Sequence, residues 1–370
     1  MKQVIMKVKR YSKFIYNMLR HQGLKATYNY TWFYLLWQSK FWSNLLLIKL
    51  GRFFNITPPF MEIEVTTKCN LKCKICEHTY WSEPARDMNF EEFKRIIDQF
   101  PHLKWIGLTG IGEAFLNKDY LKMIEYVKKK KIYVEIYDSF IFLNEKIARK
   151  LIELGVDRIL ASIDGATKET YEKIRVGSNF DVVTKNIKKL IELKKEMKKP
   201  FPEVNFHFIV NKINVKEVPL FMDYVNSIKM NDDVKVIYTL LLHPFKEIKN
   251  LVTKVPNTYF RQVKAKANSY GIRMHYGANV PDDKEPMDKC IEWIMPFVFV
   301  TGHVIPCCVG NEANQRDFQK KTSLGNIKEL SLKEIWFGKD YKELREGLRK
   351  GKVPAPCANC SIYKKTVRKK

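Results

Sequence analysis

Between residues 61 and 245, short apolar stretches alternate with longer segments in which apolar residues recur every three or four positions. The longer segments predict amphipathic helices near 90–100, 118–130, 144–154, 168–196 and 215–229. The short stretches predict buried strands at 61–66, 105–109, 132–137, 158–162, 204–210 and 234–239. This alternation is typical of parallel strands with covering helices, closed or partly closed as a barrel. In such a barrel the chemistry lies at the carboxyl ends of the strands.

Residues 1–60 form a separate segment with a basic and aromatic composition. Apolar side chains at Val4, Val8, Tyr11 and Ile15 predict an amphipathic helix over residues 3–20. A second helix is expected over residues 32–49. Ten lysines and arginines, but no aspartate or glutamate, lie between residues 1 and 61. The segment therefore combines concentrated positive charge with many apolar side chains.

The sequence leaves two interpretations of this segment open. Polar residues interrupt its apolar stretches before they reach the ~20 residues that a membrane span needs. A basic helix with aromatic residues and leucines on its other side is typical of a helix lying on an anionic membrane surface. Alternatively, the aromatic face packs on the barrel and the lysines point into water. Nucleic acid is a less favoured partner, because the aromatic residues follow helical spacing and form no stacking surface.

The whole chain of 370 residues carries 66 lysines and arginines against 40 acids, a net charge of +26. Such an excess favours an anionic partner, whether membrane headgroups, nucleic acid or an acidic protein. Enrichment in lysine, isoleucine and glutamate is also typical of thermophilic proteins. The net charge therefore limits the classes of partner, but it does not indicate which reaction the protein catalyses.

Three cysteines, Cys69, Cys73 and Cys76, follow the first predicted strand at the spacing C-x3-C-x2-C. Structural zinc and most ferredoxin-type clusters use four protein ligands, so a set of three leaves one metal position open. Zinc is the main alternative, but His78, the only nearby fourth ligand, lies outside common spacings. Disulfides are disfavoured because no signal peptide is found. The trio therefore predicts a reactive metal centre.

This arrangement resembles the radical S-adenosylmethionine (radical SAM) superfamily. The resemblance implies a 4Fe–4S cluster on the three cysteines, with S-adenosylmethionine (SAM) on the open iron, in a partial (β/α)6 TIM-like barrel over residues 61–245. After the second strand, the segment Leu108-Thr-Gly-Ile-Gly-Glu113 is similar to the family's Gly-Gly-Glu segment. It implies that Gly110, Gly112 and Glu113 bind the cofactor near its methionine ammonium group, since glycine permits close backbone approach.

Two segments after the fourth strand, Ala161-Ser-Ile-Asp-Gly165 and Tyr171-Glu-Lys-Ile-Arg175, resemble the subgroup with SPASM or Twitch extensions. The resemblance implies cofactor contacts from Ser162, Asp164 and Arg175, through a hydroxyl group and a forked guanidinium group. It also implies contacts from Ile75, against adenine, and from Asn211, after the fifth strand. The alternative for Arg175 is an ion pair with a glutamate on the surface of its own helix.

Candidate catalytic residues rest on weaker signals. After the third strand the chain reads Tyr137-Asp-Ser-Phe140, where the family has Thr-Asn-Gly. Asp138 in this loop is a candidate proton acceptor, and the alternative is an aspartate that caps the loop. His207 and Tyr238, on the fifth and sixth strands, are further candidates.

A second group of cysteines lies near the end of the chain: Cys290, Cys307, Cys308, Cys357 and Cys360. By the resemblance, residues 246–286 link the barrel to a SPASM- or Twitch-type domain over residues 287–370. Gly302 between two apolar stretches predicts a β-hairpin, and a helix is expected over residues 331–349.

By the resemblance, four of these thiols ligate one auxiliary 4Fe–4S cluster: Cys290, Cys307, Cys357 and Cys360. Cys307 is preferred to Cys308 because the family ligand directly follows a proline, and Cys308 is then a buried free thiol. One cluster is expected because no cysteine follows Cys360. Zinc is the alternative, since four thiolates satisfy it equally well.

The resemblance implies an oxidoreductase that cleaves SAM reductively and abstracts hydrogen from an unactivated C–H bond, with electrons from a ferredoxin- or flavodoxin-type donor. Oxygen-labile clusters predict a cytoplasmic setting, peripheral to the membrane if residues 1–60 bind lipid. On that interpretation the substrate is a lipid chain, and the outcome is C–C bond formation or dehydrogenation. The alternative substrate is a peptide or protein side chain. The alternative of another class is a nucleic-acid-binding iron–sulfur protein that forms no radical.

Overall fold

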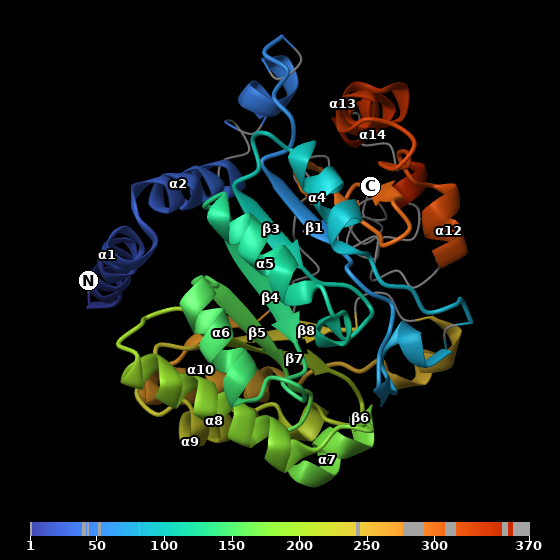
Figure 1. Ribbon diagram of the computed structural model, residues 1–370. Helices are drawn as coiled ribbons and strands as arrows, with labels where there is room; N and C mark the ends of the chain where they lie inside the picture. The colour runs from blue at the N-terminus through green and yellow to red at the C-terminus, as the bar shows by residue number, and fades with distance from the viewer. Residues whose placement is uncertain are drawn as a thin grey trace.

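In the computed structural model, a nine-stranded sheet forms the centre of the protein (Figure 1). The structure describes residues 2–38, 42, 44–50, 53–80, 82–241, 245–276, 292–307, 316–349 and 354–357. The strands are β1 (Phe60–Ile63), β3 (Trp105–Leu108), β4 (Tyr133–Asp138), β5 (Arg158–Ser162), β7 (Glu203–Val210), β8 (Lys235–Leu240), β9 (Arg273–Tyr276), β10 (Phe297–Val298) and β11 (Val304–Ile305). Their order is β11-β10-β1-β3-β4-β5-β7-β8-β9, parallel throughout except for the β10–β11 pair.

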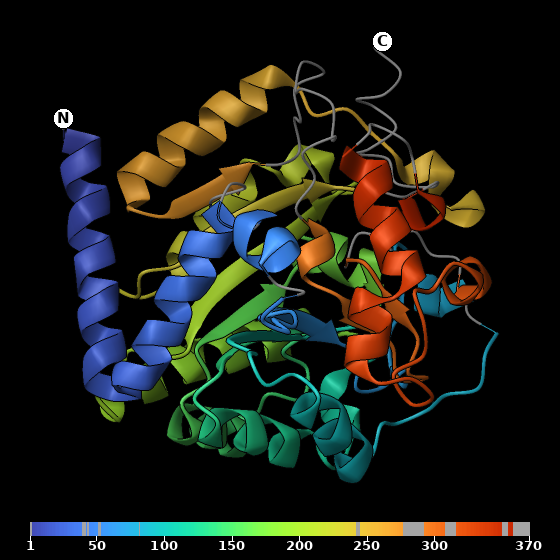
Figure 2. The same cartoon turned by 90° about the horizontal axis from the view of Figure 1, so that it is seen from above.

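The predicted partial barrel is confirmed. All six strands expected between residues 61 and 245 are present, and helices between them cover the outer face of the sheet (Figures 1 and 2). These helices are α4 (Phe90–Asp98), α5 (Tyr120–Lys129), α6 (Glu145–Leu154), α7 (Lys168–Ile174), α8 (Phe180–Glu196) and α9 (Leu220–Ile228). Every residue of β1 and β3 is buried, as expected for strands covered on both faces. Among the described strands the two edges, β9 and β11, do not pair, so the barrel is open.

The prediction of a single helix over residues 168–196 is wrong, because two helices, α7 and α8, occupy this range. The chain leaves α7 at Arg175 and forms the short strand β6 (Arg175–Val176) before α8 begins. Gly177 then takes a left-handed conformation with φ of 91°, which glycine adopts without the steric cost of a side chain. The Asn179 side chain caps α8 by accepting a hydrogen bond from Val182 N.

The segment expected to link two domains contains regular structure in its first part. Residues 246–276 form the 3-10 helix η5 (Lys246–Leu251), α10 (Asn257–Tyr270) and β9, and β9 pairs in parallel with β8. This part therefore adds another helix and strand to the barrel. Residues 277–286 lie outside the described residues.

The C-terminal residues add a hairpin and three helices to the edge beside β1. Phe299, Gly302 and His303 close the β10–β11 hairpin, and Gly302 has a φ of 91°, as its position in a turn requires. β10 pairs with β1, so the hairpin continues the main sheet. The helices are α12 (Arg316–Lys321), α13 (Leu332–Phe337) and α14 (Lys339–Arg349). The helix expected over residues 331–349 is thus broken at Gly338, between α13 and α14.

The N-terminal helices pack against the amino ends of the strands. α1 (Lys2–Gln22) and α2 (Leu24–Gln38) contact each other, and α2 contacts β3 and β4. The Phe33 ring stacks on that of Trp105 at 5.6 Å and also contacts Phe60 and Tyr133, the first residues of β1 and β4. In the view of Figure 2, α2 lies in front of the strands. One set of N-terminal aromatic residues therefore packs on the barrel, as the second interpretation of this segment proposed.

The helix expected over residues 32–49 is also different in the structure. α2 ends at Gln38, and a short π-helix, η1 (Asn44–Lys49), follows. Within the described part of the chain, no helix is both long enough and apolar enough to cross a membrane.

We predict that Phe33→Ala lowers the free energy of unfolding by about 3 kcal/mol, because the substitution leaves a gap among three aromatic rings. Leu35→Ala on the same helix serves as a control, since Leu35 is exposed and its loss should cost no more than about 0.5 kcal/mol. Urea denaturation measures both values. Equal losses would contradict the packing of α2 on the barrel.

Candidate functional site

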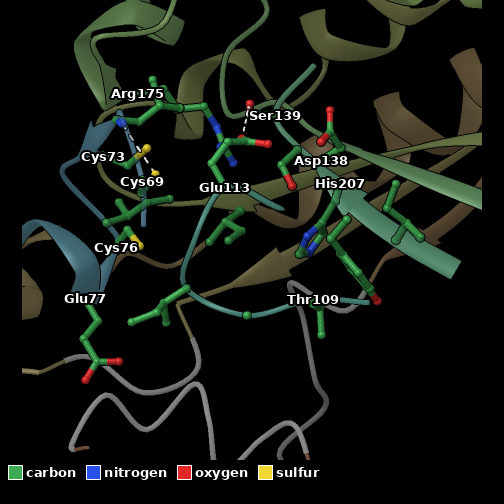
Figure 3. Close-up of a pocket in the computed structure, with 18 of the residues that line it drawn as sticks. Cys69, Cys73, Cys76, Glu77, Thr109, Glu113, Asp138, Ser139, Arg175 and His207 are labelled. Atoms are coloured by element: carbon green, nitrogen blue, oxygen red, sulfur yellow. Dashed lines mark hydrogen bonds between the residues drawn. The ribbon is translucent and has the colours of Figure 1, made fainter. Parts of the chain in front are cut away.

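A cavity of about 470 Å³ lies at the carboxyl ends of the central strands (Figure 3). Its polar and charged lining residues are Glu62, Cys69, Cys73, Cys76, Glu77, Thr109, Glu113, Tyr137, Asp138, Ser139, Ser162, Arg175, His207 and Thr239. Its other lining residues are Leu71, Ile75, Gly110, Ile111, Gly112, Leu160, Ile209, Ile237, Leu240, Leu241, Ile248 and Phe297. The lining thus combines polar and apolar side chains, at the end of the barrel where such folds carry their chemistry.

The three cysteines of the first group line one end of this cavity. They lie on the loop between β1 and α4, which contains the short strand β2 (Lys72–Cys73). β2 pairs antiparallel with β6, so that Cys73 lies opposite Arg175, and Lys74 N donates to the Ile174 carbonyl oxygen at 2.8 Å. All three thiols are free, and Figure 3 shows them grouped below Arg175. A strand from distant sequence therefore fixes the cysteine loop.

Arg175 is held in turn by Asp164. The Arg175 Nε and Nη2 atoms lie 2.8 and 2.6 Å from Asp164 Oδ2, and Ile209 N donates to Asp164 Oδ1 at 2.8 Å. Asp164 is fully buried and does not line the cavity. The partner of Arg175 is therefore an aspartate inside the barrel, and the alternative of an ion pair on the helix surface is not observed.

The thiols fit an iron–sulfur cluster better than a single metal ion. Burial raises the pKa of Cys73 to about 11 and that of Cys76 to about 12, partly opposed by Arg175. Direct bonds to iron would stabilise the thiolates that burial disfavours. Among the described residues, no three His, Cys, Asp or Glu side chains converge closely enough for one metal ion. A 4Fe–4S cluster bonds each cysteine to a different iron, so its ligands need not converge on one point.

His78, the nearby residue considered as a fourth zinc ligand, does not support the zinc alternative. His78 is hydrogen bonded through Nε2 to the Thr67 carbonyl oxygen at 2.9 Å, and it does not line the cavity. A fourth ligand would have to come from elsewhere.

The glycines after β3 permit close contact with the cysteine loop. A side-chain carbon at Gly112 would lie 2.3 Å from the Thr66 carbonyl oxygen, and one at Gly110 would lie 2.7 Å from Glu64 Cγ. Glu113 N also donates to the Lys68 carbonyl oxygen at 2.7 Å. Both glycines line the cavity, but the closest approach that they allow is to protein backbone and to Glu64.

Glu113 and Asp138 form a buried pair of carboxyl groups. Ser139 Oγ donates to Glu113 Oε2 at 2.6 Å (Figure 3). Phe140 N donates to Asp138 Oδ1 at 2.7 Å. Asp138 Oδ2 finds no donor among the described residues. Burial and the neighbouring Glu113 raise the pKa of Asp138 well above its usual range, and burial raises that of Glu113. We infer that the two carboxyl groups share a proton, which would supply the missing donor.

Asp138 has the capping role that the sequence analysis gave as the alternative, and its role as a proton acceptor stays a prediction. Its hydrogen bond from Phe140 N caps the loop, as the alternative proposed, while the side chain lines the cavity. Ser139, which the sequence analysis did not select, holds Glu113 from the same loop.

Of the other predicted residues, Ser162, Ile75 and His207 line the cavity. His207 Nε2 lies 2.9 Å from the Thr239 hydroxyl oxygen, and burial lowers the pKa of His207 to about 4. The imidazole is therefore neutral at physiological pH. Thr239 lines the cavity as well, although sequence reasoning did not identify it.

Besides Asp164, two predicted residues are not brought to the cavity. Tyr238 is fully buried on the other face of β8, where its hydroxyl donates to the Val218 carbonyl oxygen at 2.9 Å. Asn211 is buried in the loop after β7, and its Oδ1 accepts a hydrogen bond from Ile213 N. Asn214 in the same loop donates to the Asp164 carbonyl oxygen at 2.9 Å. These asparagines shape the loop that supports Asp164.

A buried ion pair joins the barrel to the C-terminal helices. Arg316 Nη2 on α12 lies 2.8 Å from Glu64 Oε2, directly after β1, and its guanidinium group covers the Phe299 ring at 3.7 Å. Burial raises the pKa of Glu64, and Arg316 opposes this effect. Sequence reasoning missed the pair, although two acids among the buried apolar residues of this segment, Glu62 and Glu64, were a signal that a cation lies nearby.

The second group of cysteines is only partly described. Cys307 follows β11, close enough to Tyr341 to influence its ionisation, and Cys357 packs against the core from a 3-10 turn, η8 (Ala355–Cys357). Cys290, Cys308 and Cys360 lie outside the described residues. The predicted ligand set of the auxiliary cluster therefore stays a prediction.

We predict that Asp164→Ala destabilises the protein by about 3–5 kcal/mol, because it leaves Arg175 buried without a partner. The exposed pair Lys168–Asp181 provides a control, and Asp181→Ala should cost less than about 1 kcal/mol. Urea denaturation gives the free energies. A small effect of Asp164→Ala would show that the cysteine loop does not depend on this pair.

A second prediction concerns pH. The raised pKa of Asp138 means that the folded protein binds a proton more tightly than the unfolded chain, so wild-type stability falls as pH rises above the usual carboxyl range. Asp138→Asn keeps a donor and removes this titration. Its stability relative to wild type should therefore improve between about pH 5 and pH 8.

Asp119→Asn is the matched control for this prediction. The Lys122 side chain lowers the pKa of Asp119, so the effect of that substitution should be constant over the same range. Thermal unfolding at several pH values compares both variants with wild type. A pH-independent effect of Asp138→Asn would contradict the shared proton.

Two family models match the chain. Residues 63–225 match the radical SAM superfamily, and residues 290–361 match SPASM, an iron–sulfur cluster-binding domain. These ranges contain the two groups of cysteines. The matches imply a 4Fe–4S cluster with SAM at the first group and auxiliary iron–sulfur clusters in the second domain.

Individual proteins agree with these matches. The chain is 26% identical to a tungsten-containing aldehyde ferredoxin oxidoreductase cofactor-modifying protein of Pyrococcus furiosus, over 82% of this chain and 87% of the relative. It is 30% identical to a probable GTP 3′,8-cyclase of Methanococcus maripaludis strain C7, over 68% of this chain and 85% of the relative.

Among solved structures, Streptococcus suis SuiB bound to SAM has a similar fold. The TM-score is 0.62 at 16% identity, over 85% of this chain and 74% of SuiB. The partial barrel, the cysteine trio at its cavity and these relationships lead to one conclusion: the chain belongs to the radical SAM superfamily and carries a SPASM domain.

Proposed function

We propose that this radical SAM enzyme abstracts hydrogen from a C–H bond of a polar organic substrate that enters the cavity at the carboxyl ends of the strands. The observation that carries the proposal is the composition of that cavity. Cysteine thiols lie at one end, and Asp138 and His207 lie at the other (Figure 3). Together with Ser139 and Thr239, which also line the cavity, they are called here the polar wall. Such a wall can orient a substrate by hydrogen bonds beside the cofactor.

The residues at the end of the cavity where the three cysteines lie would hold the cofactor. Cys69, Cys73 and Cys76 would ligate the cluster, and Arg175 would lie beside it as a fixed positive charge. When bound, the cluster and SAM supply reductive cleavage of SAM to the 5′-deoxyadenosyl radical, with the electron from a ferredoxin- or flavodoxin-type donor. A cationic ammonium group beside Glu113 would replace the proton that this carboxyl group shares with Asp138.

The substrate that we favour is an organic cofactor precursor or a peptide side chain. His207 is neutral and can accept or donate a hydrogen bond, while the Asp138 carboxyl group can donate one. The relatives include a protein named for cofactor modification, and SuiB has also been solved bound to a precursor peptide. Both kinds of substrate combine polar groups with C–H bonds, which suits a cavity lined by both polar and apolar side chains.

A lipid chain, which the membrane interpretation suggested, is less favoured. An alkyl chain would remove the polar wall from water without offering it hydrogen bonds. The N-terminal helices also contact the first residues of β1, β3 and β4, while the cavity lies at the opposite ends of the strands. Contact between those helices and a bilayer would not bring the cavity to it.

The outcome after hydrogen abstraction is either C–C bond formation or dehydrogenation, and mass spectrometry of the product separates them. The interpretation as a nucleic-acid-binding iron–sulfur protein rests on the net charge of +26 alone. It predicts no 5′-deoxyadenosine, so the assay for radical formation also tests it.

We expect the anaerobically reconstituted full chain to form 5′-deoxyadenosine from SAM and dithionite. Cys73→Ala should reduce the rate at least about 100-fold, because the cluster loses its central ligand. Cys308→Ala, which removes a cysteine outside the trio, is the control and should retain the activity. Mass spectrometry and iron analysis measure both. Equal activity of Cys73→Ala and wild type would overturn the proposal.

The substrate class is tested separately with fractions from cells that make the protein. Polar small molecules, peptides and lipids are added one at a time, and 5′-deoxyadenosine formation is followed. We expect stimulation by a polar small-molecule or peptide fraction. Stimulation by the lipid fraction alone would reject the polar substrate while leaving radical formation intact.

A further inference from the structure

Exposed apolar side chains are concentrated in the N-terminal segment. Of the 19 large apolar residues that the described chain exposes, 12 lie between residues 8 and 54. They are Val8, Tyr11, Tyr16, Leu19, Leu24, Tyr28, Tyr34, Leu35, Trp42, Leu50, Phe53 and Phe54. We call this set the N-terminal apolar surface. Single exposed apolar residues need no explanation, but their concentration in one segment of the sequence favours a role for that segment in binding.

This surface is distinct from the aromatic residues that pack on the barrel. Phe33 and Tyr30 face the strands, and Met18 is fully buried. Phe53 and Phe54, in the turn before β1, contact each other yet remain 82% and 60% exposed. The fold therefore buries one aromatic set and leaves a second set partly exposed.

One part of α1, residues 8–13, is also exposed. Residues 8–13 are exposed at every position, around the whole circumference of the helix. This part of α1 contacts the rest of the protein through Arg10 Nη2, which donates to the Gly271 carbonyl oxygen at 3.0 Å, and through the Tyr11 ring, which lies against Tyr34. Because tertiary packing supplies most helix stability, contact with an external partner would stabilise this exposed part of the helix.

The charge of the segment identifies the chemistry of that partner. Lys9, Arg10, Lys13, Arg20 and Lys25 are exposed among the apolar residues, and residues 1–61 contain no acid. A second copy of the same surface would be repelled by this charge. A surface that offers both negative charge and an apolar layer satisfies the cations and the rings together, and an anionic lipid membrane does so.

We propose that α1, α2 and the Phe53–Phe54 turn bind the interface of an anionic lipid membrane and leave the catalytic cavity facing water. The orientation follows from the topology. Phe33 of α2 contacts the first residues of β1, β3 and β4, and the turn leads into the start of β1. The cavity residues come from the carboxyl ends of the same strands. Membrane binding thus localises the enzyme without selecting a lipid substrate, and the proposal is independent of the proposed reaction.

The test uses the full-length reconstituted protein and vesicles of pure phosphatidylcholine or of equal parts phosphatidylcholine and phosphatidylglycerol. Co-sedimentation should be strong only with the anionic vesicles at low salt. Phe53→Ser with Phe54→Ser should weaken it at least about tenfold, because two rings no longer enter the interface. Lys9→Glu with Lys13→Glu should weaken it similarly and reduce its dependence on salt.

Leu220→Ser with Val252→Ser is the matched control. These residues are 48% and 47% exposed and lie outside the N-terminal segment, so vesicle binding should not change. Thermal unfolding and 5′-deoxyadenosine formation should stay at wild-type values in every variant, since all substituted side chains are exposed.

Three results would overturn the proposal. The first is equal binding to neutral and anionic vesicles, or binding to neither. The second is unchanged binding by the phenylalanine variant together with displacement by RNA, which would indicate a nucleic-acid surface. The third is a dimer in light scattering that the phenylalanine variant converts to a monomer without a loss of vesicle binding, which would indicate a second copy of the chain.

Discussion

The buried pair between Arg175 and Asp164 is the interaction on which the site depends. Through β6, the backbone of Arg175 pairs with the cysteine loop, and its side chain is fixed by a fully buried carboxylate. Asp164 is fixed in turn by Ile209 N, and its backbone carbonyl by Asn214. A loop that carries three cysteines is thereby attached to two central strands, which gives metal ligands the rigid support that they require.

The rest of the cavity shows how burial sets the charge of each group. Burial beside Glu113 raises the pKa of Asp138, and burial lowers the pKa of His207, which lies beside Thr239. Arg175 retains its charge because Asp164 balances it. The cavity therefore has a fixed cation beside the cysteines and hydrogen-bonding side chains, among them Asp138 and His207, farther from them. This asymmetry separates the part that would hold the cofactor from the part that would orient a substrate.

The two ends of the barrel serve different purposes. At the carboxyl ends, loops from several strands bring the cavity residues together. At the amino ends, α2 covers the strands with Phe33 and Tyr30 and leaves a second aromatic set exposed. Opposite placement of the two surfaces means that binding through one does not restrict access to the other. The Glu64–Arg316 pair ties the C-terminal helices to the same central strand, β1, on which the cysteine loop begins.

The sequence alone determined the parallel strands and the cysteine trio, because apolar periodicity and residue spacing are local properties. It also gave Glu113, Asp138, Arg175 and His207 as cavity residues. Only the tertiary structure decided that Tyr238 points away from the cavity and that Asp164 pairs with Arg175. It also revealed that Ser139 donates a hydrogen bond to Glu113 and that Glu64 pairs with Arg316. Which face of a strand a side chain occupies depends on how that strand pairs with its neighbours. Contacts such as Glu64–Arg316 join residues far apart in sequence, so only the folded chain reveals them.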